Sequence, residues 1–360
     1  MTPELVLAAS CLTGFVSVVL AGPKAIKYLA SSGIYGVDQQ KPEKPKVPTS
    51  GGILVLFGFM FSVTLFLGLS QLLNVNSFNV TVLLASLCSI TLIALIGLID
   101  DIHVPRDEEI IIETPDHFFY AFIEDVGSAD EEHEDIDRQG LSQFFKMLFV
   151  LPAVLPLIAV GAGSPSMTLP LLGTVNWGLI YPLVLLPVGL LFVANVVNML
   201  AGMNGLSSGL SIVAGSALGV FALLNGEIEA AVIGFSLAST LLGFLVFNWY
   251  PASLLPGDSL TYLSGAALFS AMVVGNMERF GVFIFVPWIV EFFLKLRSGF
   301  NAHSWGNLVD GKLKPQHEKN YSLTIPLMKK GLDEKQITVT LIGLEAVFCV
   351  SGVLLFSLVL

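Results

Sequence analysis

Between two long apolar runs the chain reads Asn195-Val-Val-Asn198-Met-Leu-Ala-Gly202-Met-Asn204-Gly205-Leu-Ser-Ser-Gly209, a stretch rich in amides and glycines and without charge. Its polar residues begin where the preceding apolar run, 179–194, should leave a lipid bilayer. Asn195 and Asn198 are three positions apart and would share one face of a helix. The stretch is either a polar loop between two membrane helices, or a site where amide groups ligate a metal or bind a sugar or nucleobase.

The composition predicts that the whole chain is a membrane protein. Of its 360 residues, 54% are hydrophobic and only 12% are charged, whereas soluble proteins have about 25% charged residues. The apolar runs approach the roughly 20 residues that a spanning helix needs, and they lack the alternation of barrel strands. We therefore predict an all-α integral membrane protein, a single polytopic domain over 1–360. Its three cysteines lie in apolar surroundings, which argues against a disulfide or metal framework.

The hydropathy pattern predicts about ten transmembrane helices, separated by loops of two kinds. The loops after the second, fourth, sixth and eighth spans are short and nearly uncharged, whereas every lysine and arginine except Arg279 lies in or beside the other loops. The positive-inside rule places these charged loops, and an active site formed by them, in the cytoplasm. The predicted spans are 4–22, 51–73, 80–99, 143–161, 177–194, 209–224, 230–247, 260–276, 280–297 and 337–358.

One charged loop, 102–142, is an acidic insertion. Between Asp107 and Asp137 it contains 13 acidic residues, and a run of like charges of this kind is typical of a solvated segment. Because Asp and Glu contribute little to membrane orientation, the insertion leaves the predicted topology unchanged.

Two adjacent carboxylates, Asp100 and Asp101, follow the third span. They repel each other unless a divalent cation, a lysine or a proton is near; alternatively, they only mark the water boundary. Lys146 is the only cation at the start of the fourth span, and it either faces this compartment's acidic groups or only snorkels to the surface. Asp258, behind Pro256-Gly257, either caps a helix or joins the same site.

Two further loops are candidates for substrate binding. The first, 35–52, places Lys41 among alternating lysines and prolines and ends in Pro48-Thr49-Ser-Gly-Gly. It would either anchor at anionic lipid or meet a phosphorylated ligand, with backbone N–H groups near Thr49. The other is the substrate loop 298–336, whose His303 and Trp305 could bind a sugar or a nucleotide, although an ordinary surface loop fits equally well.

The polar side chains that this topology collects at one membrane face are rich in oxygen. Hard oxygen ligands without cysteine or a histidine pair suit Mg²⁺, or Mn²⁺, rather than zinc. Mg²⁺ typically binds one or two carboxylates together with substrate phosphates. A metal, lysines and amides at a membrane surface predict phosphoryl chemistry between an aqueous and a lipidic substrate, with no nucleic-acid partner.

Taken together, the motifs resemble a known family. The pattern Asn-x-x-Asn-x-Leu-Ala-Gly-x-Asn-Gly-Leu from Asn195, the Asp100-Asp101 pair, and Phe247-Asn-Trp-Tyr-Pro followed by Gly257-Asp-Ser are similar to the polyprenyl-phosphate N-acetylhexosamine-1-phosphate transferases, of the glycosyltransferase family 4 type. The Ala-Gly-x-Asn-Gly form looks like the eukaryotic and archaeal branch, the UDP-N-acetylglucosamine–dolichyl-phosphate N-acetylglucosaminephosphotransferases. The resemblance covers nearly the whole chain in the order of its motifs.

The resemblance implies a reaction in which N-acetylglucosamine-1-phosphate passes from UDP-GlcNAc to a polyprenyl or dolichyl phosphate, with release of UMP. It implies that Asn204 meets the uridine and that Asp100 or Asp101 deprotonates or positions the lipid phosphate. The candidate site residues, including those of the loops above, fall into three groups. They are the metal ligands Asn198 and Asp258, the catalytic residues Asp100, Asp101 and Lys146, and the substrate-binding residues Asn195, Asn204, Gly205, Lys41, Thr49, Leu255, His303 and Trp305.

Two departures from the family leave alternatives open. The segment around His303 lacks the arginines that bind the N-acetyl sugar, so another UDP-N-acetylhexosamine is an alternative donor, and Leu255 stands where an aromatic residue stacks on uracil. A secondary transporter is the alternative from a different class, but it would place ionisable residues near the bilayer midplane. The acidic insertion and the resemblance to the eukaryotic and archaeal branch favour an archaeal cell membrane over an endoplasmic reticulum. Whether the protein forms a homodimer stays open.

Overall fold

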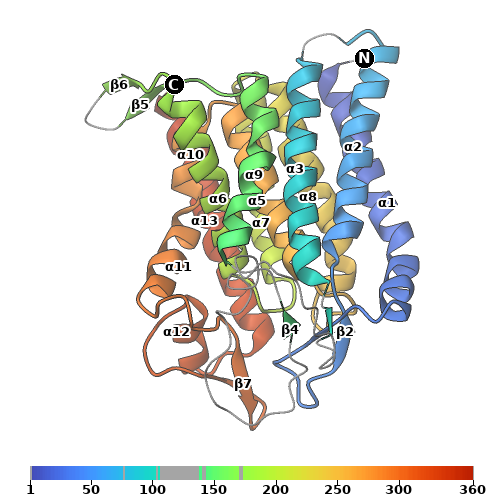
Figure 1. The fold of residues 1–360 in the computed structure, drawn as a ribbon, viewed down its shortest axis with the longest axis vertical. Helices are drawn as coiled ribbons and strands as arrows, with labels where there is room; N and C mark the ends of the chain where they lie inside the picture. Colours follow the sequence, from blue (N-terminus) through green and yellow to red (C-terminus); the bar gives the residue numbers. More distant parts are fainter. Residues whose placement is uncertain are drawn as a thin grey trace, which may run out of the picture.

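The computed structural model describes residues 2–75, 78–102, 104–105, 138–139, 143–169 and 173–359. Its helices stand side by side along one direction and form a bundle (Figure 1). Seven helices of this described part are long and apolar enough to cross a membrane, which confirms the all-α, multi-pass membrane fold. They are α1 (Pro3–Ser31), α2 (Gly52–Leu72), α3 (Val80–Asp101), α6 (Leu186–Met199) with the π-helical turn η1 (Tyr181–Leu185) before it, α7 (Leu206–Leu224), α8 (Ile228–Asn248) and α13 (Glu334–Val359).

The predicted number of ten spans is not confirmed. The other three predicted spans correspond to α5 (Gln143–Ala159), α9 (Gly257–Val274) and a pair of short helices, α10 (Glu278–Ile284) and α11 (Val286–Leu296). The predicted span 280–297 is divided into these two short helices, because the chain leaves the helix at Phe285. Pro287 then lies in the first turn of α11, the position where its missing N–H group is tolerated.

The loops contain short antiparallel hairpins that we did not predict. In the last of them Asp310 and Gly311 both have positive φ and form the turn, a geometry that Asp-Gly pairs favour. The short helix α12 (Thr324–Lys329) follows this hairpin, and most of the acidic insertion 102–142 lies outside the described residues. The pairs are β1 (Tyr35–Val37) with β2 (Lys46–Pro48), β3 (Val104–Pro105) with β4 (Arg138–Gln139), β5 (Ser166–Leu169) with β6 (Gly173–Asn176), and β7 (Gly306–Val309) with β8 (Lys312–Pro315).

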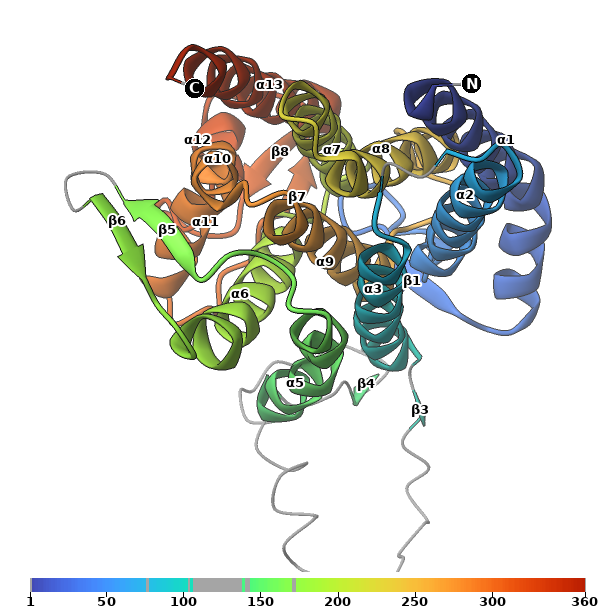
Figure 2. The ribbon, with the colours of Figure 1, turned by 90° about the horizontal axis from the view of Figure 1, so that it is seen from above.

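Helix α9 lies in the middle of the bundle, packed against α2, α3, α6, α7 and α8 (Figure 2). Its residues 259–273 are all buried. Glycines let the neighbouring backbones approach closely: an added Cβ at Gly97 of α3 would lie 2.6 Å from the Asp258 carbonyl oxygen, and one at Gly265 would lie 2.6 Å from Cα of Ala194 in α6. Such small residues are the usual means of close helix packing in membranes, and here they fix the ends of α3 and α6 relative to α9.

The polar loops gather at one end of the bundle, which we call the loop face. It comprises the loops 32–51, 200–205, 249–256 and 297–333 with the ends of α3 and α6 and the first turns of α9 and α13. Both ends of the chain lie near the opposite end (Figure 1). The predicted grouping of these loops is therefore confirmed, whereas the cytoplasmic position of the loop face stays a prediction.

We expect Gly97→Ala to destabilise the bundle by about 1–3 kcal/mol, because the new methyl group would overlap backbone atoms of α9 that cannot turn away. Gly68→Ala in α2 is the matched control, since its added methyl group would have no atom within 4 Å. That change should be neutral or slightly stabilising. Thermal unfolding in detergent measures both variants, and equal melting temperatures would contradict the importance of this contact.

Candidate active site

The carboxylate of Asp101, the last residue of α3, binds the first turn of α9. Its Oδ1 accepts a hydrogen bond from the Asp258 N–H (2.6 Å), and its Oδ2 accepts from the N–H (3.1 Å) and the hydroxyl (2.6 Å) of Ser259. These N–H groups have no partner within α9, and a negative charge at a helix N-terminus is favourable. Gly257 has φ +68°, and a Cβ there would collide with the Asp101 carboxylate. Asp101 therefore fixes the backbone that presents Asp258.

Asn198, in the last turn of α6, is joined to the same turn of α9 through Thr261. The Thr261 hydroxyl donates to Asn198 Oδ1 (3.0 Å) and lies 3.1 Å from the Asp258 carbonyl oxygen. We call Asp100, Asp101, Asn198 and Asp258 the helix-end cluster, because the ends of three helices bring them together.

The helix-end cluster has the donor chemistry of a magnesium site. Among the described side chains, no group of three or more histidine, cysteine or acidic residues is placed to hold a metal. Mg²⁺ needs only one or two protein carboxylates, because water and substrate phosphates complete its shell. Asp100 and Asp258 offer carboxylates, and the amide oxygen of Asn198 keeps a second lone pair beside its bond from Thr261. The oxygen donors present thus fit a hard divalent cation.

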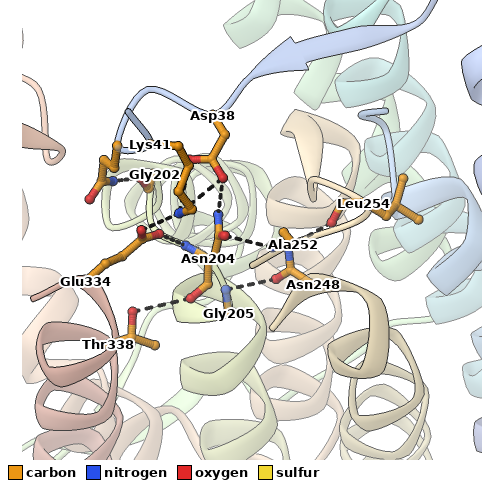
Figure 3. A network of polar contacts seen from close by, with 11 residues as sticks. Asp38, Lys41, Gly202, Asn204, Gly205, Asn248, Ala252, Leu254, Glu334 and Thr338 are labelled. Carbon is orange, nitrogen blue, oxygen red and sulfur yellow. Dashed lines mark hydrogen bonds and ion pairs between the residues drawn. The ribbon is translucent and has the colours of Figure 1, made fainter. Parts of the chain in front are cut away.

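A second group of polar residues surrounds Asn204, and Figure 3 shows it from close by. The Asn204 side chain is buried; its Oδ1 accepts from the Ala252 N–H (2.9 Å) and its Nδ2 donates to Asp38 (3.2 Å). Its backbone N–H donates to Glu334 (2.8 Å), and its carbonyl accepts from Thr338 (3.3 Å). We call this set the Asn204 network. It joins the first loop, the 249–256 loop and α13, and the predicted contact of Asn204 with uridine stays a prediction.

Lys41 belongs to the Asn204 network as part of a buried ion pair. Its ammonium lies 2.5 Å from the Glu334 carboxylate and 3.2 Å from Asp38, and 4.1 Å from the centre of the Tyr250 ring. Three features thus hold the lysine in place: two carboxylates and an aromatic face. Lys41 was predicted to meet a phosphorylated ligand, and that contact stays a prediction.

Asn248, which we did not single out from the sequence, holds the turn at Gly205. Its Oδ1 accepts from the Gly205 N–H (3.2 Å) and the Ser208 hydroxyl (2.9 Å), while its Nδ2 donates to the Leu254 carbonyl (3.0 Å). Gly205 has φ +76°, a conformation that glycine adopts at no steric cost. The signal was present in the Phe247-Asn-Trp-Tyr-Pro motif, but a single amide there does not reveal its partners.

Thr49 and Leu255 lie where the first loop crosses the chain that enters α9. The Leu255 N–H donates to the Pro48 carbonyl (2.8 Å), and the Leu255 carbonyl accepts from the Gly51 N–H (3.0 Å). Thr49 is buried and Leu255 is half-buried. These backbone bonds place both predicted substrate-binding residues close to the start of α9, at the loop face.

The substrate loop brings His303 and Trp305 to the end of α6. Their rings lie 4.7 Å apart, centre to centre, and an added Cβ at Gly202 would lie 3.3 Å from Trp305 Cδ1. Partial desolvation, with the charges of Lys295 and His317, lowers the pKa of His303, so its imidazole is neutral near pH 7. An uncharged imidazole beside an indole ring can exchange hydrogen bonds with a sugar.

Two predicted site residues remain, one in α6 and one in α5. Asn195 lies in α6, where its side chain donates to the Leu191 carbonyl of the same helix (2.8 Å). Lys146 lies in the first turns of α5, and its side chain falls outside the described part of the structure. Their predicted roles stay predictions.

The sequence model of the family described as Glycosyl transferase family 4 matches residues 83–276, more than half of the chain. The chain belongs to glycosyl transferase family 4. The matched region of the family includes α3, α6 and α9, and therefore all four residues of the helix-end cluster. The first loop and the substrate loop 298–336 lie outside it.

Two archaeal relatives are similar over almost the whole chain. A protein of Saccharolobus solfataricus, provisionally named UDP-N-acetylglucosamine–dolichyl-phosphate N-acetylglucosaminephosphotransferase, is 32% identical over 92% of this chain and 90% of its own length. A protein of Sulfolobus acidocaldarius with the same name is 30% identical over 96% and 94%. The phospho-N-acetylmuramoyl-pentapeptide-transferase of Chlorobium chlorochromatii is 25% identical over 72% and 68%. The similarity to these two archaeal relatives thus extends over more than nine-tenths of this chain.

We expect Asp101→Asn to lower the free energy of unfolding by about 2 kcal/mol, because the amide offers one acceptor in place of two and removes the charge at the N-terminus of α9. Ser259→Ala removes only one of the three donors and should cost about 1 kcal/mol. Thermal unfolding in detergent compares them. If Asp101→Asn melts at the wild-type temperature, the carboxylate does not hold α9 in place.

Lys41→Met should destabilise the protein by about 3–5 kcal/mol, because it leaves the buried Glu334 carboxylate without its cation. Glu334→Gln alone should also be destabilising, since it leaves Lys41 with only Asp38. The double variant should lose less stability than the sum of the two single changes. Denaturation of all four proteins measures this coupling, and strictly additive effects would contradict it.

Proposed function

We propose that this protein transfers N-acetylglucosamine-1-phosphate from UDP-GlcNAc to a polyprenyl phosphate of the dolichyl type and releases UMP. The observation that supports it most is the link from Asn198 through Thr261 to Asp258, beside the Asp100-Asp101 pair. This link lies in a glycosyl transferase family 4 member whose archaeal relatives bear the name of this reaction. In the reaction, a lipid phosphate oxygen forms a bond to the phosphorus next to the sugar, and the bond from that phosphorus to UMP breaks.

In this proposal Asp258 and Asn198 hold Mg²⁺, or Mn²⁺, at the end of α9. The bound ion would neutralise the charge of the donor pyrophosphate, which is the main requirement of phosphoryl transfer. The hard oxygen donors of the helix-end cluster support this choice. Thr261 orients the Asn198 amide so that its oxygen and Asp258 belong to one site.

The two adjacent aspartates have different tasks in the proposed mechanism. Asp101 is a positioning residue, because both of its oxygens bind the first turn of α9. Asp100, at the end of α3 in the same cluster, would orient the acceptor phosphate, with Lys146 close to the phosphates. A phosphate monoester has a second pKa near 6, so the acceptor is mostly a dianion at pH 7. It therefore needs an orienting group and charge neutralisation more than a general base.

The loop face, in this proposal, faces the cytoplasm of an archaeal cell. The concentration of lysine and arginine in its loops supports that orientation. UDP-GlcNAc would then enter from the cytoplasm, and the lipid phosphate would reach the helix-end cluster from the membrane surface. His303 and Trp305 would contact the sugar, since the substrate loop packs on the end of α6 next to Asn198.

A different UDP-N-acetylhexosamine is the second candidate donor, because the segment 301–306 contains no arginine. Competition among UDP-GlcNAc, UDP-GalNAc and UDP-glucose for transfer to one polyprenyl phosphate decides between them. A preference for UDP-GlcNAc supports the proposal, and a preference for UDP-GalNAc would change the assigned donor while leaving the reaction class intact.

Purified protein should release UMP from UDP-GlcNAc and polyprenyl phosphate only when Mg²⁺ is present. Asp258→Ala and Asn198→Ala should each lower kcat at least about a hundredfold, because metal binding supplies several kcal/mol of transition-state stabilisation. Asn225→Ala is the matched control, since this amide bonds to its own helix at the far end of α7 and should leave turnover unchanged.

Wild-type turnover by Asp258→Ala would refute the metal assignment. Uptake of labelled UDP-sugar into proteoliposomes without any lipid-linked product would refute the transferase and support a transporter. Quantifying UMP and the lipid product in the same vesicles separates these results.

A further inference from the structure

The buried carboxylate of Glu291, in α11, binds the substrate loop. Glu291 has no exposed surface; its Oε2 accepts from the Leu323 N–H (2.8 Å), and its Oε1 lies 3.3 Å from the Ser304 hydroxyl. Lys295, one helical turn later, lies 4.0 Å from the same carboxylate and donates to the Ala302 carbonyl. Glu291 and Lys295 thus pair with each other, and both are attached to the substrate loop.

Ser304 connects this carboxylate to the helix-end cluster. Its single hydroxyl proton is shared between the Met199 carbonyl (2.8 Å), which follows Asn198 at the end of α6, and Glu291 Oε1 (3.3 Å). Its own carbonyl accepts from the Thr324 hydroxyl (2.5 Å). Ser304 is therefore held by α11, α6 and the start of α12 at the same time, and it lies between His303 and Trp305. The anchored backbone of Ser304 therefore connects the two residues that carry these rings.

The position of the carboxylate argues for a role beyond packing. Burying a charge lowers the stability of the folded protein unless the charge is paired and hydrogen-bonded. Apolar side chains of similar volume often give the same or a higher stability. Both oxygens of Glu291 are directed to the substrate loop, and its cation binds that loop as well. The arrangement holds 302–305 and Leu323, the residue before α12, in one geometry.

We infer that Glu291 is a positioning residue for the sugar of the donor: acting through Ser304, it holds His303 and Trp305 beside Asn198, where they bind an N-acetylated hexose. The inference rests on the proposed transferase function. The ligand chemistry follows from the two rings, since an indole face packs against the apolar face of a hexose and a neutral imidazole exchanges hydrogen bonds with its hydroxyl or acetamido groups. Glu291 itself does not touch the substrate.

The test separates donor binding from turnover and acceptor binding. Glu291→Ala and Ser304→Ala should each raise the KM for UDP-GlcNAc about tenfold, the loss of one hydrogen bond to a charged group. The KM for polyprenyl phosphate should stay within about twofold. Glu291→Gln keeps an acceptor for the Leu323 N–H, so it should partly restore the donor KM. Ser304→Ala leaves the Glu291–Lys295 pair intact, so no buried lysine loses its carboxylate. It can therefore still test the inference if Glu291→Ala fails to fold.

A matched control and a double variant exclude a general loss of stability. Glu278→Gln removes the charge of a different acid, which is partly buried and accepts a hydrogen bond from the Tyr181 hydroxyl. Glu278 begins α10, away from the loop face, so this change should leave the donor KM unchanged. If Glu291 acts through Ser304, the donor KM of Glu291→Ala/Ser304→Ala should be no higher than that of the worse single variant. Multiplicative effects in the double variant would overturn the inference.

A second readout does not depend on activity. Amide hydrogen exchange of 301–306 should become faster in Glu291→Ala and Ser304→Ala than in the wild type, and it should not change in Glu278→Gln. Unchanged exchange in Glu291→Ala overturns this inference and leaves the proposed function standing. Faster exchange with an unchanged donor KM also overturns it. A wild-type protein that releases no UMP from any UDP-sugar refutes the proposed function, even where the exchange result shows that Glu291 holds the loop.

Discussion

The bond between the Asp101 carboxylate and the first turn of α9 is the interaction on which the rest of the site depends. Helix α9 lies in the centre of the bundle, and its first turn presents Asp258 to the loop face. The N–H groups of Asp258 and Ser259 in that turn have no partner within the helix and need one from elsewhere in the protein. A carboxylate from α3 satisfies them and complements the helix dipole. One of the two adjacent acids, Asp101, thereby holds α9 in place.

The glycines around α9 make this bond possible. Close approach at Gly97 and Gly265 brings α3 and α6 against α9, and the positive φ of Gly257 leaves room for the Asp101 carboxylate. The ends of these three helices are thereby held close together, whereas the first loop and the substrate loop are held by separate buried charges. Lys41 and Glu334 join the first loop to α13 within the Asn204 network, and Glu291 with Lys295 fixes the substrate loop. Each loop that covers the cluster thus has its own ionic attachment to the bundle.

Much of this organisation could be predicted from the chain. The low charge content and the apolar runs predicted the membrane bundle, and the distribution of lysine and arginine predicted which loops share a face. The break at Phe285 and the short hairpins could not be predicted from hydropathy, because each depends on a few residues with special backbone geometry, such as Pro287 and the Asp310-Gly311 turn. The paired residues Glu291 and Lys295 were recognisable from their spacing, but their attachment to the substrate loop was not.

The sequence by itself determined which polar residues form the helix-end cluster and at which membrane face they lie. Each of them stands at the end of an apolar span, so the topology that follows from the hydropathy brings them to one face. They are Asp100, Asp101, Asn198 and Asp258. Only the tertiary structure decided how these groups divide their tasks. Asp100 and Asp101 are the same residue type at neighbouring positions, but hydrogen bonds are directional, and the tertiary structure brings the Asp101 carboxylate to the N–H groups of α9. Asn198 and Asn204 are likewise both amides, and only their neighbours make one a candidate metal ligand and the other the centre of a buried network.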